Sequence, residues 1–384
     1  MAEVASKSQT GEPIAFIDLQ AQRRRIGDRI GKAIAAVLEH GQFILGPEVA
    51  QLEKQLAAHC GAKHAVCCSS GTDALVLALM ALEVGPGDAV FVPSFTFAAT
   101  AEAVALVGAT PVFVDIVAET CNMDAGSLED AIAMVERESQ LKPVGIIAVD
   151  MYGQTADVRA IKSVADPRNL WIMEDGAQSY GATLDGRSMG TLTTISTTSF
   201  FPAKPLGCYG DGGAVFTDDD RLASLVRSLL FHGKGADKYD NVRIGMNGRL
   251  DTIQAAILIE KLAIFDDEMV MREKVAAGYT RALGNFAQIP VLIPGATSAW
   301  AQYTLAFENR DAVASRLKQQ GIPTAVYYPK PLHQQTAYRS YPLAPRGLPV
   351  SDRMAKTVLS VPMHPYLDSE TQGRISEAVR MAIN

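Results

Sequence analysis

The apolar runs AVCC (65–68), AVFV (89–92) and PVFV (111–114) begin a regular pattern that continues to Thr217. Three more runs of this kind follow: GIIAV (145–149), LWIM (170–173) and AVF (214–216). Short continuous apolar runs are typical of strands that are buried on both faces of a sheet. Helix-length segments such as 73–82 and 98–107 separate the runs. This alternation predicts an α/β domain, with a mainly parallel sheet sandwiched by helices.

The strand pattern stops after Thr217. The segment 249–283 is typical of one or two long helices, and long helices of this kind often link two lobes. Beyond it, an apolar run at 303–307 and helical patterns at 312–320 and 369–383 predict a smaller α+β unit, while the prolines of 327–332 predict a rigid extended loop. We therefore expect a large domain of residues 1–265 and a small C-terminal domain of residues 266–384.

Composition excludes several classes of protein. The chain has 384 residues, 48% of them hydrophobic, and a formal net charge of -7, so it is globular and acidic, which disfavours a nucleic-acid partner. The run Arg23-Arg24-Arg25 is interpreted as a solvated helix face. The longest apolar run, Ala74 to Leu82, is far shorter than the roughly 20 residues of a membrane span, and no secretion signal precedes it.

Cysteine and histidine usage points to a protein of the reducing cytoplasm. The five cysteines are an odd number without a C-x-x-C pair, and a chain of this length does not need disulfides. The six histidines are scattered, and none forms the H-x-x-H spacing that places two metal ligands on one helix face. We therefore expect a cytoplasmic location and no metal site.

Three polar segments are candidates for chemistry. The first, SSGTDAL (69–75), joins a strand to a helix, and its small residues let backbone N–H groups approach an anion at the helix N-terminus. An ordinary helix start, with Thr72 or Asp73 as N-cap, would use the same residues. The second, MEDGAQS (173–179), ends a buried strand in Asp175, which would face the crevice where open parallel sheets bind ligands. There, a carboxylate could keep a ring nitrogen protonated, although a surface or capping Asp fits equally well.

The third segment, TTSFFPAKPLGCYGDGG (197–213), holds a lysine between two prolines, so Lys204 is expected in a loop rather than a helix. Its amine could form a Schiff base, and the glycines that follow would let a flat cofactor lie against the backbone. A solvated loop lysine is the simpler alternative for this residue taken alone.

Together, the blocks GTDAL (71–75), EDGAQS (174–179), SFFPAK (199–204) and GMNGRLD (245–251) resemble the signature motifs of the DegT-type nucleotide-sugar aminotransferases. The resemblance runs from about Ile14 to the C-terminus. It implies the aspartate-aminotransferase fold (fold type I) and dependence on pyridoxal 5'-phosphate. Family members that dehydrate sugars have histidine in place of this lysine, so Lys204 indicates amino transfer.

The resemblance also implies roles for individual residues. Lys204 would be the catalytic lysine that binds the cofactor's aldehyde and moves the substrate's proton, and Asp175 would pair with the pyridinium nitrogen. Five further residues would contact the cofactor: Gln178 beside its phenolic oxygen, Phe97 stacked on its ring, and Gly71, Thr72 and Ser199 on its phosphate. Asn247 would reach the phosphate of the neighbouring subunit's cofactor, so a homodimer with shared active sites is expected.

The resemblance also implies a particular sugar substrate. The blocks FIDLQAQ (16–22), GQFILGPEV (41–49) and SVPMHPYL (360–367) most resemble the branch that aminates carbon 3 of UDP-2-acetamido-2-deoxy-3-oxoglucuronate with glutamate, for the lipopolysaccharide O-antigen of bacteria. In that branch a histidine commonly occupies the place of Tyr327. Tyrosine cannot carry positive charge, so it would hold a substrate carboxylate less strongly, and Arg249 and His333 are candidates to compensate.

Three alternatives stay open from the sequence. The same chemistry could act at carbon 4 of a UDP-, GDP- or dTDP-linked 4-keto-6-deoxy sugar. A regulatory or binding protein could keep the pocket without turnover. An amino-acid or cysteine-desulfurase type enzyme of the same fold is the third alternative, although its motifs around the lysine differ.

Overall fold

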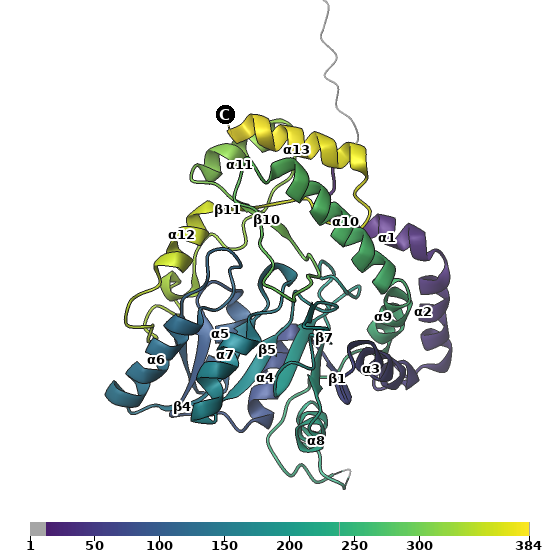
Figure 1. The fold of residues 1–384 in the computed structure, drawn as a ribbon. Coiled ribbons are helices and arrows are strands. Elements are labelled where there is room, and N and C mark those ends of the chain that lie inside the picture. The colour runs from purple at the N-terminus through teal and green to yellow at the C-terminus, as the bar shows by residue number, and fades with distance from the viewer. Residues whose placement is uncertain (1–12, 238, 384) are drawn as a thin grey trace, which may run out of the picture.

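A larger unit built on a central sheet carries a smaller unit above it (Figure 1). The computed structural model describes residues 13–237 and 239–383. Helices α1 (Leu19–Ile26), α2 (Arg29–His40) and α3 (Pro47–Cys60) lie along one side of the larger unit, and α10 (Phe265–Leu283) runs from the larger unit to the smaller one. The first polar segment and Lys204 both belong to the larger unit.

The sheet has seven strands in the order β1-β9-β8-β5-β4-β2-β3. The strands are β1 (His64–Cys68), β2 (Asp88–Pro93), β3 (Thr110–Val114), β4 (Lys142–Val149), β5 (Trp171–Asp175), β8 (Ile195–Ser199) and β9 (Gly213–Thr217). Strands β3, β2, β4, β5 and β8 pair in parallel, whereas β9 is antiparallel to both of its neighbours. The predicted mainly parallel sheet is confirmed, and each of the six apolar runs overlaps a strand.

Strand β8 was not predicted, because its sequence ISTTS lacks an apolar run. Its polar side chains are buried with hydrogen-bond partners instead: Ser196 Oγ donates to Glu174 Oε2 at 2.9 Å, and Thr198 Oγ1 donates to the carbonyl of Gly176 at 3.0 Å. A buried polar side chain is tolerated when it is hydrogen-bonded. These two bonds fix β8 beside the end of β5.

Helices cover both faces of the sheet, as predicted, because side chains of a strand alternate between its faces. Cys68 belongs to the apolar cluster on one face, which also holds residues of α4 (Gly71–Ala81), α5 (Ala98–Leu106), α6 (Ala125–Glu138), α7 (Val158–Ala165) and α8 (Asp220–Leu229). Its neighbour Cys67 packs in a second cluster with α3 and α9 (Thr252–Leu262). The segment predicted as one or two helices is therefore two, α9 and α10.

The smaller unit pairs β10 (Tyr303–Ala306) with β11 (Val358–Val361) and adds α11 (Arg310–Gln319), α12 (Pro349–Thr357) and α13 (Ser369–Ile383). Its own apolar cluster includes the second half of α10, from Val275 to Leu283, whereas Phe265 at the start of α10 packs with the larger unit. The division at residue 265 stays a prediction. Short elements complete the chain: β6 (Thr183–Leu184), β7 (Arg187–Ser188) and the 3₁₀ helices Met151–Gly153, Asp166–Arg168 and Leu332–Gln334.

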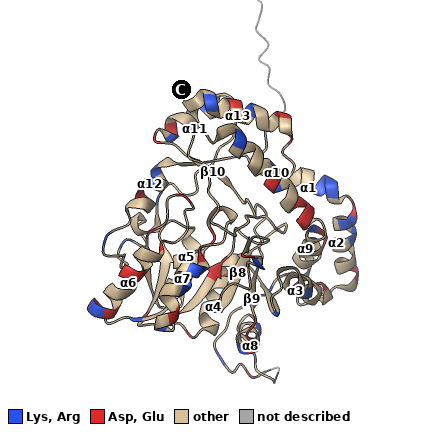
Figure 2. Cartoon of the chain, viewed as in Figure 1, with Lys and Arg blue, Asp and Glu red and all other residues tan. Residues whose placement is uncertain are grey.

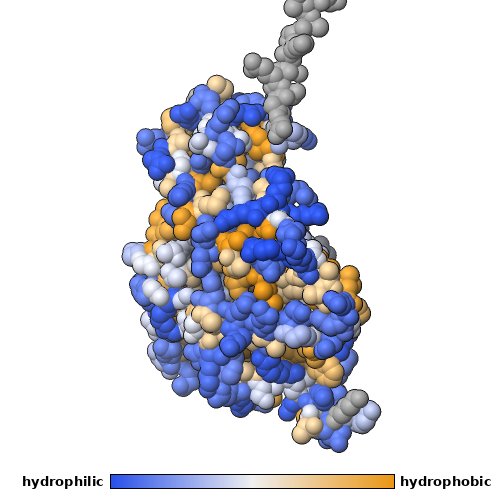
Figure 3. All heavy atoms as spheres, turned by 90° about the vertical axis from the view of Figure 1, so that its right-hand side faces the viewer, coloured by the Kyte–Doolittle hydropathy of each residue, from blue (hydrophilic) through white to orange (hydrophobic). Residues whose placement is uncertain are grey.

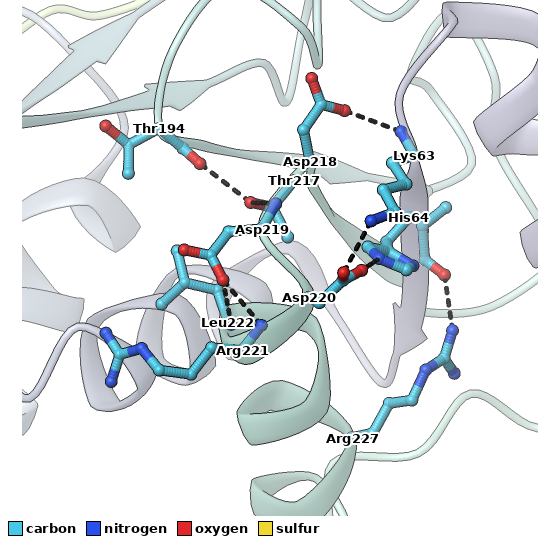
Figure 4. A network of polar contacts seen from close by, with 11 residues as sticks. Lys63, His64, Thr194, Thr217, Asp218, Asp219, Asp220, Arg221, Leu222 and Arg227 are labelled. Atoms are coloured by element: carbon cyan, nitrogen blue, oxygen red, sulfur yellow. Dashed lines mark hydrogen bonds and ion pairs between the residues drawn. The ribbon is translucent and has the colours of Figure 1, made fainter.

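A polar network fastens the edge strand β1 to β9 and α8 (Figure 4). Asp220, in the first turn of α8, accepts from Lys63 Nζ at 2.7 Å and contacts His64 Nε2 at 2.6 Å, and Asp218 accepts from the Lys63 backbone at 2.8 Å. Asp219 caps α8 by accepting from the backbone N–H groups of Arg221 and Leu222. The network holds the start of β1, whose far end leads into the turn at Ser69.

Charged residues of both signs are interspersed over the outer helices (Figure 2). The run Arg23-Arg24-Arg25 is exposed on α1, as predicted, and Arg25 pairs with Asp267 at 2.7 Å. Within residues 13–237 and 239–383, no helix is long and apolar enough to cross a membrane. The same ranges contain no group of three or more His, Cys, Asp or Glu side chains arranged for a metal ion.

Candidate active site

A cavity of about 410 Å³ opens at the carboxyl ends of β1, β2, β5 and β8. This is where an open parallel sheet is expected to bind ligands. Eight residues singled out in the sequence line it together: Gly71, Thr72, Phe97, Asp175, Gln178, Ser199, Lys204 and Tyr327. The three polar segments, which are spread over residues 69 to 213, therefore form one site.

The turn after β1 begins α4 beneath the cavity. Ser70 is the N-cap and its Oγ accepts from the Asp73 backbone at 3.0 Å, so the cap is neither Thr72 nor Asp73 as the ordinary helix start suggested. A Cβ on Gly71 would lie 2.6 Å from Ser199 Cβ and 3.1 Å from Ser199 Oγ. Only glycine allows this close approach, which places the first N–H groups of α4 beside the Ser199 hydroxyl. The turn therefore has the donors and the helix dipole of an anion site.

Asp175 is the last residue of β5 and is only 6% exposed. Its Oδ2 accepts from Thr100 Oγ1 at 2.8 Å and its Oδ1 from the Ala177 backbone at 3.3 Å. Burial raises the pKa of Asp175, while the hydrogen bond from Thr100 and the charge of Lys204 act in the opposite direction. A carboxylate without a full ionic partner in a buried site attracts a protonated nitrogen.

Lys204 lies in a loop, as predicted from its flanking prolines. Its backbone N–H donates to the Phe201 carbonyl at 2.9 Å, and its side chain enters the cavity wall. Burial lowers the pKa of the Lys204 ammonium, and the Asp175 carboxylate opposes this shift. A lowered pKa increases the share of neutral amine, which is the nucleophilic form.

Gln178 and the tyrosines form the opposite wall. The Tyr152 backbone donates to Gln178 Oε1 at 2.9 Å, which fixes the amide orientation and leaves its NH₂ group with only a long contact of 3.7 Å to Met151 Sδ. The Phe97 ring lies 6.0 Å from the Tyr328 ring, and the Tyr152 hydroxyl donates to the Tyr327 carbonyl. Phe97 is 57% exposed, so a flat ligand can reach its ring.

Three predicted residues do not line this cavity among the described residues. Asn247 is exposed and forms an antiparallel bridge with Phe231, and the Arg249 guanidinium lies 5.0 Å from the Phe231 ring centroid. The ring of His333 is held at 2.7 Å from Ser94 Oγ and 3.1 Å from Asp352 Oδ1. These contacts give His333 a structural use, and its predicted role in substrate binding stays a prediction, as do those of Asn247 and Arg249.

Sequence reasoning missed Thr100 and Tyr328. Thr100 lies in the first turn of α5, four positions after Thr96, in the segment that follows the carboxyl end of β2. The four-residue spacing of the two threonines was the only sign in the sequence that both could face the same side. Tyr328 comes from the Pro/Tyr-rich loop beside Tyr327, and nothing in its spacing indicated that the loop folds over the sheet. Further cavity residues of this kind are Ile17, Asp211 and Gln302.

The site fits pyridoxal phosphate, the cofactor that the resemblance implies. The turn at Gly71, where a Cβ would clash with Ser199, has backbone N–H donors for a phosphate. Asp175 supplies a buried acceptor for a ring nitrogen. Lys204 supplies the amine, and the NH₂ group of Gln178, whose contact with Met151 Sδ is long, supplies a donor for a ring oxygen. These groups come from three separate segments of the chain, so the cavity can hold one molecule at several points.

Comparison with known proteins agrees with this geometry. Residues 24–380 match the model of the DegT/DnrJ/EryC1/StrS aminotransferase family. A UDP-2-acetamido-2-deoxy-3-oxo-D-glucuronate aminotransferase of Pseudomonas aeruginosa is 49% identical over 93% of this chain and 96% of its own length. A pleiotropic regulatory protein of Geobacillus stearothermophilus is 41% identical over 95% of this chain and 97% of its own.

A solved structure gives the same fold. The crystal structure of a DegT DnrJ EryC1 StrS aminotransferase from Brucella abortus has a TM-score of 0.95 and 53% identity, covering 96% of this chain and 99% of that one. Aminotransferases of this family depend on pyridoxal phosphate, so the expected fold, enzyme class and cofactor are confirmed. From the sheet, the cavity and these matches it follows that the chain belongs to the DegT/DnrJ/EryC1/StrS aminotransferase family.

Proposed function

We propose that this aminotransferase moves an amino group from glutamate to carbon 3 of UDP-2-acetamido-2-deoxy-3-oxoglucuronate, a nucleotide-linked keto sugar, in the synthesis of bacterial O-antigen. The observation that most supports amino transfer is that Lys204, Asp175 and the Gly71 turn line the same cavity. The choice of sugar is supported by the name and the 49% identity of the Pseudomonas aeruginosa relative.

The side chains divide the work of amino transfer. When bound, pyridoxal phosphate supplies a ring that accepts the negative charge left on a substrate carbon. Asp175, which accepts a hydrogen bond from Thr100, would hold the ring nitrogen in its protonated form and so strengthen the ring as an acceptor. Lys204 Nζ would take the proton from the carbon of glutamate that bears the amino group and pass it to the cofactor, and with the keto sugar it would carry a proton in the opposite direction, to carbon 3. Its lowered pKa favours the neutral amine that this role needs. The Gly71 turn and Ser199 would hold the phosphate.

A homodimer in the cytoplasm is part of the same proposal. Phe97 and Phe201 line the cavity but remain 57% and 52% exposed, which is unusual for aromatic side chains beside a site that must exclude water. Three consecutive apolar residues, Phe43 to Leu45, are also exposed in the connection between α2 and α3, and Ile44 bridges to Asp251. Figure 3, which faces that side, shows hydrophobic surface between hydrophilic regions. A second subunit would cover these apolar groups.

Turnover with matched substrates tests the choice of sugar. Purified protein loaded with cofactor is given glutamate and either the 3-keto uronate or a 4-keto-6-deoxy sugar, and 2-oxoglutarate is measured. We expect 2-oxoglutarate to appear with the 3-keto uronate and not with the 4-keto sugar, and the reverse preference would move the reaction to carbon 4. Lys204→Ala is the matched control, which should fold yet release no 2-oxoglutarate.

A non-catalytic regulator is the second candidate, favoured by the name of the Geobacillus stearothermophilus relative. The two candidates differ in what glutamate does to the bound cofactor. An enzyme loses the yellow absorbance of its lysine-bound cofactor when glutamate donates its amino group, whereas a regulator without turnover keeps it. Unchanged absorbance with glutamate would favour the regulator.

A further inference from the structure

Lys261 is a buried lysine that the reaction described above does not use. It lies in α9, is 1% exposed, and donates from Nζ to the Gly207 carbonyl at 2.6 Å. The same Nζ lies 4.2 Å from the centroid of the Tyr209 ring. Within residues 13–237 and 239–383, Lys261 has no Asp or Glu within ion-pair distance. Because a lysine is rarely buried without such a partner, this placement calls for a local explanation.

The carbonyl that Lys261 binds is part of the loop that carries Lys204. The loop is closed at its base, where the Cys208 backbone donates to the Phe200 carbonyl at 2.7 Å. Gly207 is pressed against the start of the loop, since a Cβ there would lie 2.6 Å from the Phe201 carbonyl oxygen. A shift of Gly207 would therefore move the loop as a whole.

Helix α9 holds this loop at a second point. The Gln254 Oε1 atom accepts from the Tyr209 backbone at 2.9 Å. Gln254 and Lys261 lie about two helical turns apart on the same face of α9. Two polar side chains of one rigid helix therefore bind the two sides of Cys208.

We propose that Lys261 is a positioning residue that anchors the loop of Lys204 to α9 and thereby fixes the place of Lys204 Nζ in the cavity. The proposal rests on the proposed role of Lys204. The loop of Lys204 contains no helix or strand that would fix its position relative to the sheet. The hydrogen bond to Gly207 and the contact with the Tyr209 ring supply that constraint, and the ammonium strengthens both because it is charged.

The surroundings of Lys261 predict how the anchor depends on pH. Burial lowers the pKa of Lys261 to about 8, and the facing groups Cys208 and Glu268 oppose the shift. Arg23 lies near Tyr209 and adds positive charge on the outer side. Above about pH 8 the ammonium becomes a neutral amine, which still donates to Gly207 but loses its attraction to the ring. The anchor should weaken there, and only in protein that has Lys261.

Lys261→Met tests the proposal, because methionine fills a similar volume without donating a hydrogen bond. In cofactor-free protein at pH 7, we expect faster amide hydrogen exchange in the segment 204–209 than in the wild type. In loaded protein, we expect kcat to fall about tenfold or more with little change in KM, and the pKa of the lysine-bound cofactor's visible band to shift. Ile257→Val is the matched control, since Ile257 is a buried residue of α9 that packs with Ile26 and Ile30.

The outcomes separate this proposal from the proposed function. Equal exchange in the segment 204–209 for Lys261→Met and the wild type would overturn the anchor, and so would an unchanged visible-band titration. Should Lys261→Met fail to fold, Tyr209→Leu removes only the ring contact and should reduce the pH dependence of exchange between pH 7 and pH 9. A wild type without transaminase activity would overturn the proposed function, while the exchange measurement still decides the anchor.

Discussion

At Asp175, a single hydroxyl directs the carboxylate. Thr100 Oγ1 donates to Oδ2 at 2.8 Å and lies 3.2 Å from the Oγ1 of Thr96, which precedes α5, so two threonine hydroxyls lie in a chain that ends on the acid. The hydrogen bond lowers the pKa of Asp175 against the rise caused by burial. In the proposed function, Thr100 would therefore act on the cofactor nitrogen through Asp175, without touching the nitrogen itself.

Thr100→Val should retain the fold and lose the hydrogen bond, because valine has nearly the shape of threonine. Hydrogen bonds to charged groups contribute about 1.5–3 kcal/mol, so we expect kcat to fall roughly tenfold to a hundredfold. The pKa of Asp175 should rise, so the acid limb of the rate profile should move to higher pH. Measuring kcat from pH 5 to pH 8 checks this, with Thr100→Ser as the variant that keeps the hydroxyl. An acid limb at the wild-type position would contradict the role of Thr100.

At the scale of elements, the start of α4 depends on one glycine. Gly71→Ala would place a Cβ 2.6 Å from Ser199 Cβ, and we expect a loss of about 1–3 kcal/mol in the free energy of unfolding together with weaker cofactor binding. Gly31→Ala is the matched control in α2, where a Cβ meets nothing within 4 Å, so it should stabilise the protein by about 0.5–1 kcal/mol. Urea unfolding and cofactor titration of both variants check the pair. Equal cofactor affinity in Gly71→Ala and the wild type would remove the turn from the phosphate site.

The elements also show how far the sequence could be interpreted. Apolar strands such as β2 and β4 could be predicted because burial on both faces imposes an apolar run. Strand β8 could not, because its burial is made possible by partners such as Glu174 and Gly176 that are distant in the sequence. From the sequence, Asp175 could be placed at the end of a strand and Lys204 in a loop. The contact of Lys261 with Gly207 could not be predicted, because it depends on how α9 packs against that loop, which no local sequence pattern indicates.

At the scale of the whole molecule, the predicted site residues divide into two groups. Lys204 and the seven other predicted residues Gly71, Thr72, Phe97, Asp175, Gln178, Ser199 and Tyr327 line the cavity, whereas Asn247 is exposed and forms an isolated bridge with Phe231. This division is what a site shared between two subunits requires. A single chain can bring together only the residues that its own fold makes neighbours, so the role expected for Asn247 in a neighbouring subunit's site stays a prediction.

Mixed dimers test the shared site directly. A subunit with Lys204→Ala lacks the amine, and a subunit with Asn247→Ala lacks the residue proposed for its neighbour's phosphate. In a mixed dimer, one of the two sites combines the intact Lys204 of one subunit with the intact Asn247 of the other, while its counterpart carries both defects. If subunits exchange freely at equal amounts, half of the dimers are mixed and a quarter of all sites are intact, so about a quarter of wild-type activity should return. Mixing each variant with itself is the control, and no recovery at any ratio after unfolding and refolding together would confine Asn247 to its own subunit.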